Sequence, residues 1–483
     1  MLDAGINGNH AMNTPPERID ALIRGQRDAH LADLCPARAV REDRLRRLGR
    51  LLDAHDRSFN AAIRADFGAR SAYELRITET MLVQSALRHA RRHLAGWMRP
   101  RRAPVAPAYW PGRAMLMRQP LGVIGIISPW NYPLQLSLAP LIAALAAGNR
   151  AMIKPSESAP AFAAALRAAI EEYFAPDEVA VVTGDAAVGR AFAAARFDHL
   201  LFTGSTAVGR EVALAAARNL TPVTLELGGK SPVIVDASCV LEEAADRIAW
   251  GKLINAGQTC VAPDYALVPR GTEERFASLL AAGMRRQYPR FRGNPDYTAI
   301  IDERHVARLG ALVAEARDGG ARVIDVTDDA SGAGDDERRL APMLLLDVHD
   351  GMRIMREEIF GPILPIVPYD RPEDAVAYVR ARPAPLALYW FGRDRPARDR
   401  VLETTIAGGV TINDTLIHVA QDGLPLGGVG ESGHGQYHGE FGFLRFSHVK
   451  PVFVQSRLSG LGLIRPPYAP SLARLLRWLG RLT

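Results

Sequence analysis

The chain has 483 residues, of which 48% are hydrophobic and 23% are charged, a composition that excludes a disordered chain and a small binding module. The formal net charge is only +6 and no long basic run concentrates it, so a nucleic-acid partner is not expected. Three cysteines, Cys35, Cys239 and Cys260, are too few for a disulfide framework and favour a reducing compartment.

The N-terminal part of the chain predicts helices that cover a sheet. Residues 1–16 are polar and lack the apolar core of a signal peptide, so a cytoplasmic location is expected. Apolar side chains recur at three- and four-residue spacing in residues 20–96, which indicates amphipathic helices. Residues 119–149 carry no charge, but prolines and polar residues interrupt them, which favours a buried strand, loop and helix over a membrane span.

The middle of the chain alternates short apolar runs with helical patterns. The apolar runs lie at 123–127, 151–153, 179–182 and 199–202, with helical patterns at 159–174 and 187–195. A second series has strands at 232–235 and 363–367 and helices near 241–255 and 305–318. Such alternation predicts parallel β-α-β units with helices on both faces of each sheet. Residues 325–339 are rich in Asp, Gly and Ser and predict a solvated loop.

Three residues carry groups suited to chemistry. Cys260 follows Gly257 in a polar loop, where a thiol is partly exposed and its pKa can be tuned, although a lone cysteine is more often inert core. Glu226 ends an apolar run; it is either a strand residue facing solvent or a partly desolvated carboxylate suited to act as a general base on water. Asn131 lies between two prolines, either in an ordinary turn or as the rigid amide donor that an oxyanion hole needs.

Two segments that follow strands are candidates for a nucleotide site. The small residues around Gly204 and Ser205 open a predicted helix and could bring a pyrophosphate against its N–H groups, although they do not form the usual dinucleotide fingerprint. Lys154 and Glu157 offer an ammonium and a carboxylate that could bond ribose hydroxyls. A surface turn is the alternative for this second segment.

Taken in order, these motifs resemble those of the aldehyde dehydrogenase superfamily over residues 20–455. The resemblance rests on residues 129–133, 154–157, 202–210, 226–232, 257–260, 357–362 and 427–428. The class 3 type is resembled at residues 260–265, 385–389, 423–425 and 436–439, and residues 413–422 are similar to a stretch of the coniferyl aldehyde dehydrogenases. Leu426 and His434 depart from the Phe and Met that the superfamily usually has there.

The resemblance implies an α/β fold with two doubly wound parallel-sheet domains and a small β bridging or oligomerisation element. A Rossmann-like cofactor domain is expected over residues 20–228, with strands near 100–120 contributing to the bridging element. The catalytic domain is expected over 229–425. Residues 426–483 are expected to supply a return segment, a bridging strand and a C-terminal helix.

The resemblance also implies roles. Cys260 matches the nucleophile that forms a thiohemiacetal and then a thioester, Asn131 and the Cys260 backbone N–H match the oxyanion donors, and Glu226 matches the base that activates the hydrolytic water. The matching cofactor positions are Trp130, Lys154, Glu157, Gly204, Ser205, Glu358 and Phe360. Glu157 should repel a 2′-phosphate and so favours NAD, with NADP as the alternative. No metal is expected.

The expected function is NAD(P)-dependent oxidation of an aldehyde to the carboxylic acid, with an aromatic substrate such as coniferyl aldehyde. Tyr132, Trp250 and His418 are placed near that substrate; core packing is the alternative for each, and His418 is favoured as a structural hydrogen-bonding residue. A CoA-acylating dehydrogenase and a non-catalytic nucleotide-binding relative are the other candidates, and the presence of Glu226 argues against the first.

A homodimer is expected as the assembly. Residues 471–483 place leucines on one helical face and arginines around another. Docking of this helix on a partner subunit is the first interpretation, and peripheral membrane contact is the alternative.

Overall fold

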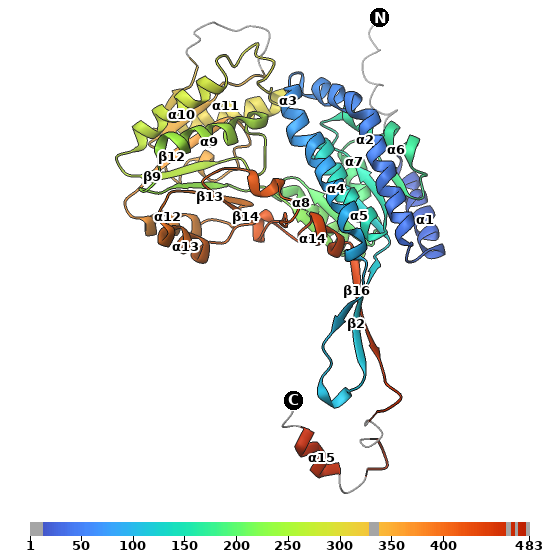
Figure 1. Cartoon of the computed structure of the whole chain (residues 1–483). Helices are drawn as coiled ribbons and strands as arrows, with labels where there is room; N and C mark the ends of the chain where they lie inside the picture. Colours follow the sequence, from blue (N-terminus) through green and yellow to red (C-terminus); the bar gives the residue numbers. More distant parts are fainter. Residues whose placement is uncertain (1–12, 328–337, 460–464, 469–471, 480–483) are drawn as a thin grey trace, which may run out of the picture.

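The computed structural model describes residues 13–327, 338–459, 465–468 and 472–479, which form two mainly parallel sheets and a small antiparallel sheet of three strands (Figure 1). The α/β fold class predicted from the sequence is therefore confirmed. Most of the predicted loop at 325–339 lies outside the described residues. The division into domains at residues 228 and 425 stays a prediction.

The first sheet has six strands in the order β15-β7-β6-β3-β4-β5. Its strands are β3 (Val123–Ile127), β4 (Arg150–Lys154), β5 (Val179–Val181), β6 (His199–Thr203), β7 (Val223–Glu226) and β15 (Gly433–His434). All neighbours are parallel except β15, which pairs antiparallel with β7. The apolar runs predicted as strands are thus strands, and each of β3, β4, β5 and β6 is buried along its whole length, as helices on both faces require.

Helices cover both faces of this sheet. One buried cluster joins it to α2 (Arg38–Phe67), α4 (Met81–Trp97), α5 (Pro133–Ala147), α6 (Pro160–Tyr173) and α14 (Gly439–Arg445). Another joins the opposite face to α1 (Pro16–Ala32), α7 (Ala186–Ala193) and α8 (Thr206–Ala217). A short α3 (Ala72–Leu75) and a π-helical turn, η2 (Arg76–Thr80), precede α4. The uncharged stretch at 119–149 therefore folds into a buried strand, a loop and a buried helix, as predicted.

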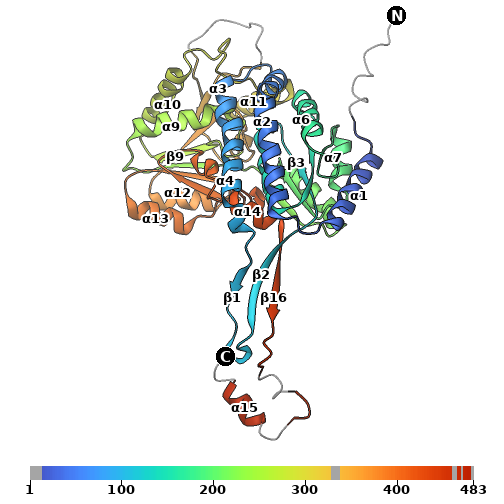
Figure 2. The ribbon, with the colours of Figure 1, turned by 45° about the vertical axis from the view of Figure 1, so that its right-hand side comes forward.

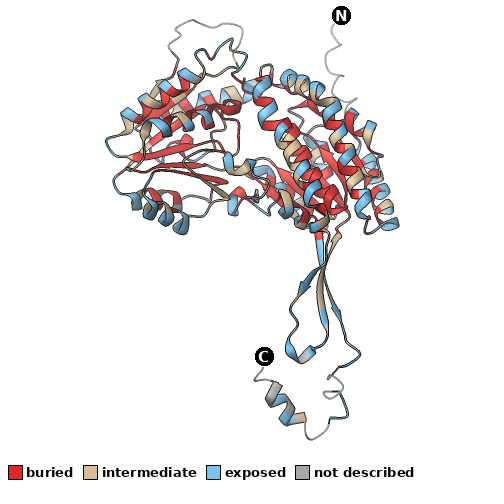
Figure 3. Ribbon diagram, viewed as in Figure 1, coloured by how far each residue is buried: buried red, intermediate tan, exposed pale blue. Residues whose placement is uncertain are grey.

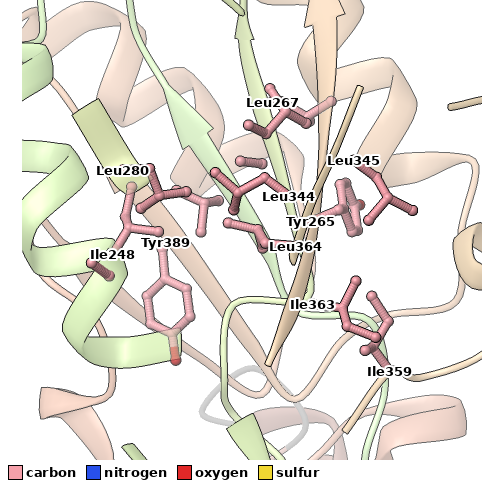
Figure 4. Packing of buried hydrophobic residues seen from close by; sticks show 14 of the residues in the cluster. Ile248, Tyr265, Leu267, Leu280, Leu344, Leu345, Ile359, Ile363, Leu364 and Tyr389 are labelled. Atoms are coloured by element: carbon pink, nitrogen blue, oxygen red, sulfur yellow. The ribbon is translucent and has the colours of Figure 1, made fainter. Parts of the chain in front are cut away.

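The second sheet has seven strands in the order β10-β11-β12-β9-β8-β13-β14, with only β10 antiparallel. Its strands are β8 (Pro232–Val235), β9 (Tyr265–Pro269), β10 (Arg322–Asp325), β11 (Met343–Leu346), β12 (Ile363–Tyr369), β13 (Ala387–Phe391) and β14 (Gly409–Ile412). Its helices are α9 (Leu241–Leu253), α10 (Glu273–Gln287), α11 (Glu303–Asp318), α12 (Pro372–Arg380) and α13 (Arg395–Thr404). Figure 4 shows how side chains such as Ile248, Leu280 and Leu364 fill the space between sheet and helices.

Short 3-10 turns lie in the connecting segments. They are η3 (Pro107–Tyr109), η4 (Ile254–Gly257), η5 (Arg353–Met355), η6 (Ile417–Ala420) and η7 (Gly430–Ser432). The predicted helix near 241–255 is thus α9 followed by η4, whose backbone leaves the helical region at Asn255 and Ala256. This kink directs the chain toward Cys260.

The third sheet is an arm that extends away from the body of the molecule (Figure 2). It has the order β1-β2-β16, formed by β1 (Arg101–Ala103), β2 (Arg113–Pro120) and β16 (Ser447–Val454). Most of its residues are exposed or half-buried, in contrast to the buried strands of the body (Figure 3). The amphipathic C-terminal segment forms α15 (Leu472–Leu479), where Leu476 is 51% exposed. No helix within the described ranges is long and apolar enough to cross a bilayer.

Candidate active site

The loop that carries Cys260 is held by an unusual backbone turn. Asn255, Ala256 and Gly257 have φ values of 51°, 50° and 76°, in the left-handed region that non-glycine residues seldom adopt. A Cβ at Gly257 would lie 2.3 Å from the carbonyl oxygen of Gly361, so only glycine fits there. The turn forms most of η4 and lies three residues before Cys260, which is half-buried. The thiol therefore lies on a fixed loop between the two sheets.

The electrostatic environment of the thiol disfavours its ionised form. Burial, followed by the nearby carboxyls of Glu358 and Glu226, raises the pKa of Cys260 to about 12. Both carboxyls thus lie close enough to act on the sulfur. Burial and both carboxyls therefore favour the neutral thiol over the thiolate.

Glu226 is the last residue of β7 and is buried. Its strand neighbour on one side is Gly433 of β15, which has no side chain, and on the other side Thr203 of β6. Neither carboxyl oxygen has a hydrogen-bond partner within the described ranges, and burial raises the pKa of Glu226 well above its ordinary value. The desolvated carboxylate predicted from the sequence is therefore present, and the solvent-facing alternative is wrong.

Asn131 connects the first sheet to the cysteine loop. It follows β3 and is buried, and its Nδ2 donates to the carbonyl oxygen of Gln258 at 3.1 Å. Its own carbonyl oxygen accepts from Arg70 Nη1 at 2.9 Å and from Asn255 Nδ2 at 3.1 Å. A side-chain amide has two N–H donors, so one remains for an acceptor beside Cys260.

The cofactor positions predicted from the sequence lie at or just after the carboxyl ends of β3, β4 and β6 in the first sheet, and at residues 358–360 before β12. Lys154, at the end of β4, bonds Glu157 at 2.7 Å, and Ser205 is the N-cap of α8, accepting from Val208 N at 3.4 Å. Gly204 lies directly before that cap. The ring of Trp130 meets the ring of Phe360 edge-on at 5.5 Å. The ammonium, the open helix N-terminus and the aromatic pair suit a dinucleotide.

The carboxyl of Glu358 packs directly against the backbone of Gly228. A Cβ at Gly228 would lie 2.1 Å from Glu358 Oε2, so the carboxyl enters space that any other residue would fill. A cleft of about 440 Å³ opens beside it, with Thr206, Gly229 and Lys230 among its lining residues. Burial, and then Asp264, raise the pKa of Glu358 to about 8. These residues fit the ribose and phosphate groups of a nucleotide.

A buried ion pair that the sequence did not predict anchors the segment carrying Glu358. Lys230 Nζ bonds the carboxylate of Asp264 and donates to the carbonyl oxygens of Ile354 at 2.7 Å and Glu357 at 2.9 Å. Asp264 Oδ1 in turn accepts from Ile359 N at 3.0 Å. The pair therefore ties the start of β8 and the cysteine loop to the residues on either side of Glu358.

The three residues predicted near the substrate have different environments. Tyr132 is buried, and its hydroxyl lies 2.6 Å from Thr259 Oγ1, next to Cys260 in sequence. Trp250, on α9, is 38% exposed, so core packing is the wrong interpretation for it. His418, in η6, bonds Thr411 Oγ1 through Nδ1 at 2.7 Å, and burial lowers its pKa to about 4. His418 is thus a neutral hydrogen-bonding residue at physiological pH.

Two functional candidates were not singled out from the sequence. Tyr437 is buried, its hydroxyl has no hydrogen-bond partner among the residues described, and burial raises its pKa with contributions from Glu226 and Cys260. The motif at 436–439 was the available signal. Arg70 is buried beneath Asn131, and a lone arginine in a helical segment gives no sequence signal. Within the described ranges, no cluster of three or more His, Cys, Asp or Glu side chains could hold a metal ion.

Comparison with known proteins gives consistent matches. The model of the aldehyde dehydrogenase family matches residues 16–452. A Pseudomonas aeruginosa protein named "Probable coniferyl aldehyde dehydrogenase" is 50% identical over 459 residues, covering 95% of each chain. A substrate-bound structure of Staphylococcus aureus AldH has a TM-score of 0.89 at 36% identity, over 95% of this chain and 99% of that one. A P. syringae indole-3-acetaldehyde dehydrogenase in complex with NAD+ has a TM-score of 0.81 at 25% identity, over 92% and 90% of the two chains.

Proposed function

Because the chain belongs to the aldehyde dehydrogenase family of NAD(P)-dependent enzymes, we propose that it oxidises an aldehyde to the carboxylic acid through a thioester on Cys260. The observation that carries this proposal is the convergence of three groups. The Asn131 amide bonds the carbonyl oxygen of Gln258, two residues before Cys260, and the carboxyls of Glu226 and Glu358 lie near enough to Cys260 to raise the pKa of its thiol.

The proposed reaction has two steps, oxidation of the aldehyde to a thioester and hydrolysis of that thioester. The Cys260 thiolate adds to the carbonyl carbon, and the resulting oxyanion is held by the free N–H of the Asn131 amide and by the Cys260 backbone N–H. A dinucleotide held by Lys154, Glu157 and the N-terminus of α8 would supply the two-electron oxidant that takes up the hydride of that carbon, so that Cys260 is left as a thioester. Glu226 then removes a proton from water as it attacks the thioester; the C–S bond breaks, and the acid leaves. Its buried, unpartnered carboxyl suits this role.

NAD is the proposed cofactor. Glu157 is held beside Lys154 at 2.7 Å, and this ion pair lowers the pKa of Glu157 despite its partial burial. A carboxylate at this position bonds ribose hydroxyls and repels a 2′-phosphate. The complex of the P. syringae relative with NAD+ supports the same choice.

An aromatic aldehyde of the coniferyl type is the proposed substrate class. The support is the name of the P. aeruginosa relative at 50% identity, together with Tyr132 beside the cysteine loop and the partly exposed Trp250. Aromatic rings of this kind offer large apolar contact area to a planar substrate.

The test is NADH formation by purified protein with aromatic, medium-chain and short aldehydes, with NAD+ or NADP+ and without CoA. We expect the acid as product, fastest oxidation of cinnamyl-type aldehydes, and preference for NAD+. A strict need for CoA would support an acylating enzyme instead, and binding of NAD+ without oxidation of any aldehyde would support a non-catalytic relative.

Cys260→Ala should abolish this oxidation and leave the affinity for NAD+, followed by quenching of intrinsic fluorescence, largely unchanged. Cys239→Ala is the matched control, because Cys239 packs near Asp236 and Glu243 rather than near the candidate site; it should retain full activity. Loss of NAD+ binding in Cys260→Ala would mean that Cys260 is structural.

We propose further that two copies associate through the arm. Strands β2 and β16 pair over eight residues, and Val449 and Val454 of β16 are 40% and 48% exposed. Apolar side chains on an extended sheet are favourably covered by a second protein surface. The amphipathic helix α15 would dock on the partner subunit.

A further inference from the structure

Beneath the oxyanion loop lies a buried arginine that no part of the reaction uses directly. Arg70 is fully buried between α2 and α3, and its guanidinium faces the rings of Phe67 at 4.7 Å and Tyr132 at 5.0 Å. We propose that Arg70 is a positioning residue that fixes the Asn131 peptide, and through it the amide that holds the oxyanion. This role rests on the proposed function of Asn131.

The directional contacts of Arg70 are few and point to one place. Nη1 donates to the carbonyl oxygen of Asn131 at 2.9 Å and to Glu79 Oε1 at 3.3 Å. Nε lies 3.6 Å from Glu74 Oε1, and neither Nε nor Nη2 has a hydrogen bond within the described ranges. The remainder of the group is packed against rings, which is a cation–π arrangement. Within the described residues, the hydrogen bonds of Arg70 therefore go to the carbonyl oxygen of Asn131 and to the carboxylate of Glu79.

Two glutamates beside Arg70 hydrogen-bond to the segments that carry Asn131 and Cys260. Glu79, in the π-helical turn η2, accepts through Oε2 from Gln135 N at 2.8 Å, at the start of α5. Glu74 accepts through Oε2 from Asn255 N at 3.0 Å and through Oε1 from Thr298 Oγ1 at 3.1 Å. Turns of π-helix are frequent at functional sites. One cation thus links the loop after β3 to the strained turn before Cys260.

The consequence for Asn131 follows from its geometry. Its carbonyl oxygen is fixed by Arg70 and Asn255, and its side-chain Nδ2 by the carbonyl oxygen of Gln258. Because the backbone carbonyl and the side-chain amide of Asn131 are both held, the second N–H of that amide points in one fixed direction. Removing the Arg70 contact frees the peptide plane, and a displacement of the amide by an ångström is enough to cost roughly 10²-fold in rate.

A variant of Arg70 alone would leave two buried carboxyls without their cation, so stability and positioning must be separated. We therefore compare Arg70→Met with the triple variant Arg70→Met, Glu74→Gln, Glu79→Gln, which removes the charges and retains side-chain oxygens for Gln135 N and Asn255 N. The expected result is a lowered Tm in the single variant, recovery of Tm in the triple variant, and a kcat for the best aldehyde roughly 10²-fold below the parent in both. The KM for NAD+ should stay unchanged.

Arg41→Met is the matched control. Arg41 is also buried, and its guanidinium donates to the carbonyl oxygens of Pro36, Ala146 and Ala147, away from Asn131. It should lower Tm without lowering kcat. Recovery of kcat together with Tm in the triple variant would overturn the positioning role, because neutral packing alone would then suffice.

A double-mutant cycle with Asn131→Ala locates the effect, with single-turnover NADH formation as the readout. If Arg70 acts through Asn131, adding the triple substitution to Asn131→Ala should slow hydride transfer by less than about 3-fold, since the contact it supports is already gone. A further loss equal to that seen in the parent would overturn the proposal. If Asn131→Ala by itself leaves the rate unchanged, the proposed oxyanion role is wrong and the positioning role falls with it.

Discussion

Glu226 combines two properties that seldom coexist in a protein interior. Its carboxyl is buried, and both oxygens lack hydrogen-bond partners within the described residues. An unpaired buried carboxylate is costly, and burial therefore raises the pKa of Glu226 well above its ordinary value. At pH values between the ordinary pKa and the raised pKa of Glu226, the folded state binds more protons than the unfolded chain. The contribution of Glu226 to the free energy of unfolding therefore falls as the pH rises through this range. Such a cost is typical of a functional residue.

Replacement of Glu226 by Gln should separate the two steps of the reaction. Without the base, the first hydride transfer still occurs, but hydrolysis of the thioester slows by about 10²- to 10⁴-fold. Stopped-flow absorbance should show a burst of NADH close to one equivalent of sites, followed by very slow turnover. Equal loss of the burst and of turnover would assign Glu226 to an earlier step.

Glu358 should set the acidity of the nucleophile. It is the charge that contributes most, after burial, to the raised pKa of Cys260, and its own pKa of about 8 means that it ionises before the thiol does. Glu358→Gln should therefore lower the thiol pKa, measured as the pH dependence of alkylation by iodoacetamide. Glu357→Gln is the control, because Glu357 is exposed and paired with Arg353 at 3.0 Å. An unchanged profile in Glu358→Gln would refute the electrostatic coupling.

At the scale of single residues, the sequence predicted those candidate site residues that lie in recognisable short motifs. Cys260, Glu226 and Asn131 lie in short motifs with prolines and glycines around them, and the structure brings them together. Arg70 and Glu79 could not be predicted, because a charged residue in a helical pattern is normally on the solvent face. Their burial results from long-range packing against the loop after β3, which leaves no local pattern.

Among the elements, the strands and helices of the parallel units follow directly from periodicity. Four apolar runs became β3, β4, β5 and β6, and the uncharged stretch became a strand and helix α5 because prolines divide it. The two-residue strand β15 could not be predicted, since it has no alternation and pairs with β7 from a distant part of the sequence. The left-handed turn at Asn255 and Ala256 was likewise hidden, because neither residue is glycine.

The arm should determine the oligomeric state. Val449→Glu combined with Val454→Glu places charges on the exposed apolar positions of β16, and we expect light scattering after size exclusion to show monomers of 52.5 kDa where the parent gives dimers. Leu31→Glu is the control: Leu31 is also exposed, at 62%, but lies on α1 away from the arm. A monomeric parent chain, or a dimer that survives both charges, would contradict the proposed assembly.

At the scale of the whole molecule, the candidate site belongs to neither sheet alone. Asn131 follows strand β3 of the first sheet and Glu226 is the last residue of β7, whereas Cys260 and Glu358 lie on segments of the second. Alternation along the chain predicted two sheets, because parallel strands need a helical crossover. It could not predict how the sheets dock, since that depends on contacts between residues far apart in the sequence, such as Asn131 Nδ2 with the carbonyl oxygen of Gln258 and Asn255 N with the carboxylate of Glu74.

The pairing of β15 with β7 has a consequence for the timing of biogenesis. A nascent chain leaves the ribosome from its N-terminus, so Cys260 emerges long before Gly433 and His434 can close the edge beside Glu226. Until then β7 has an unpaired edge beside Glu226. A polypeptide that ends before residue 433 therefore cannot complete the first sheet, even when every strand of the second sheet has already been made.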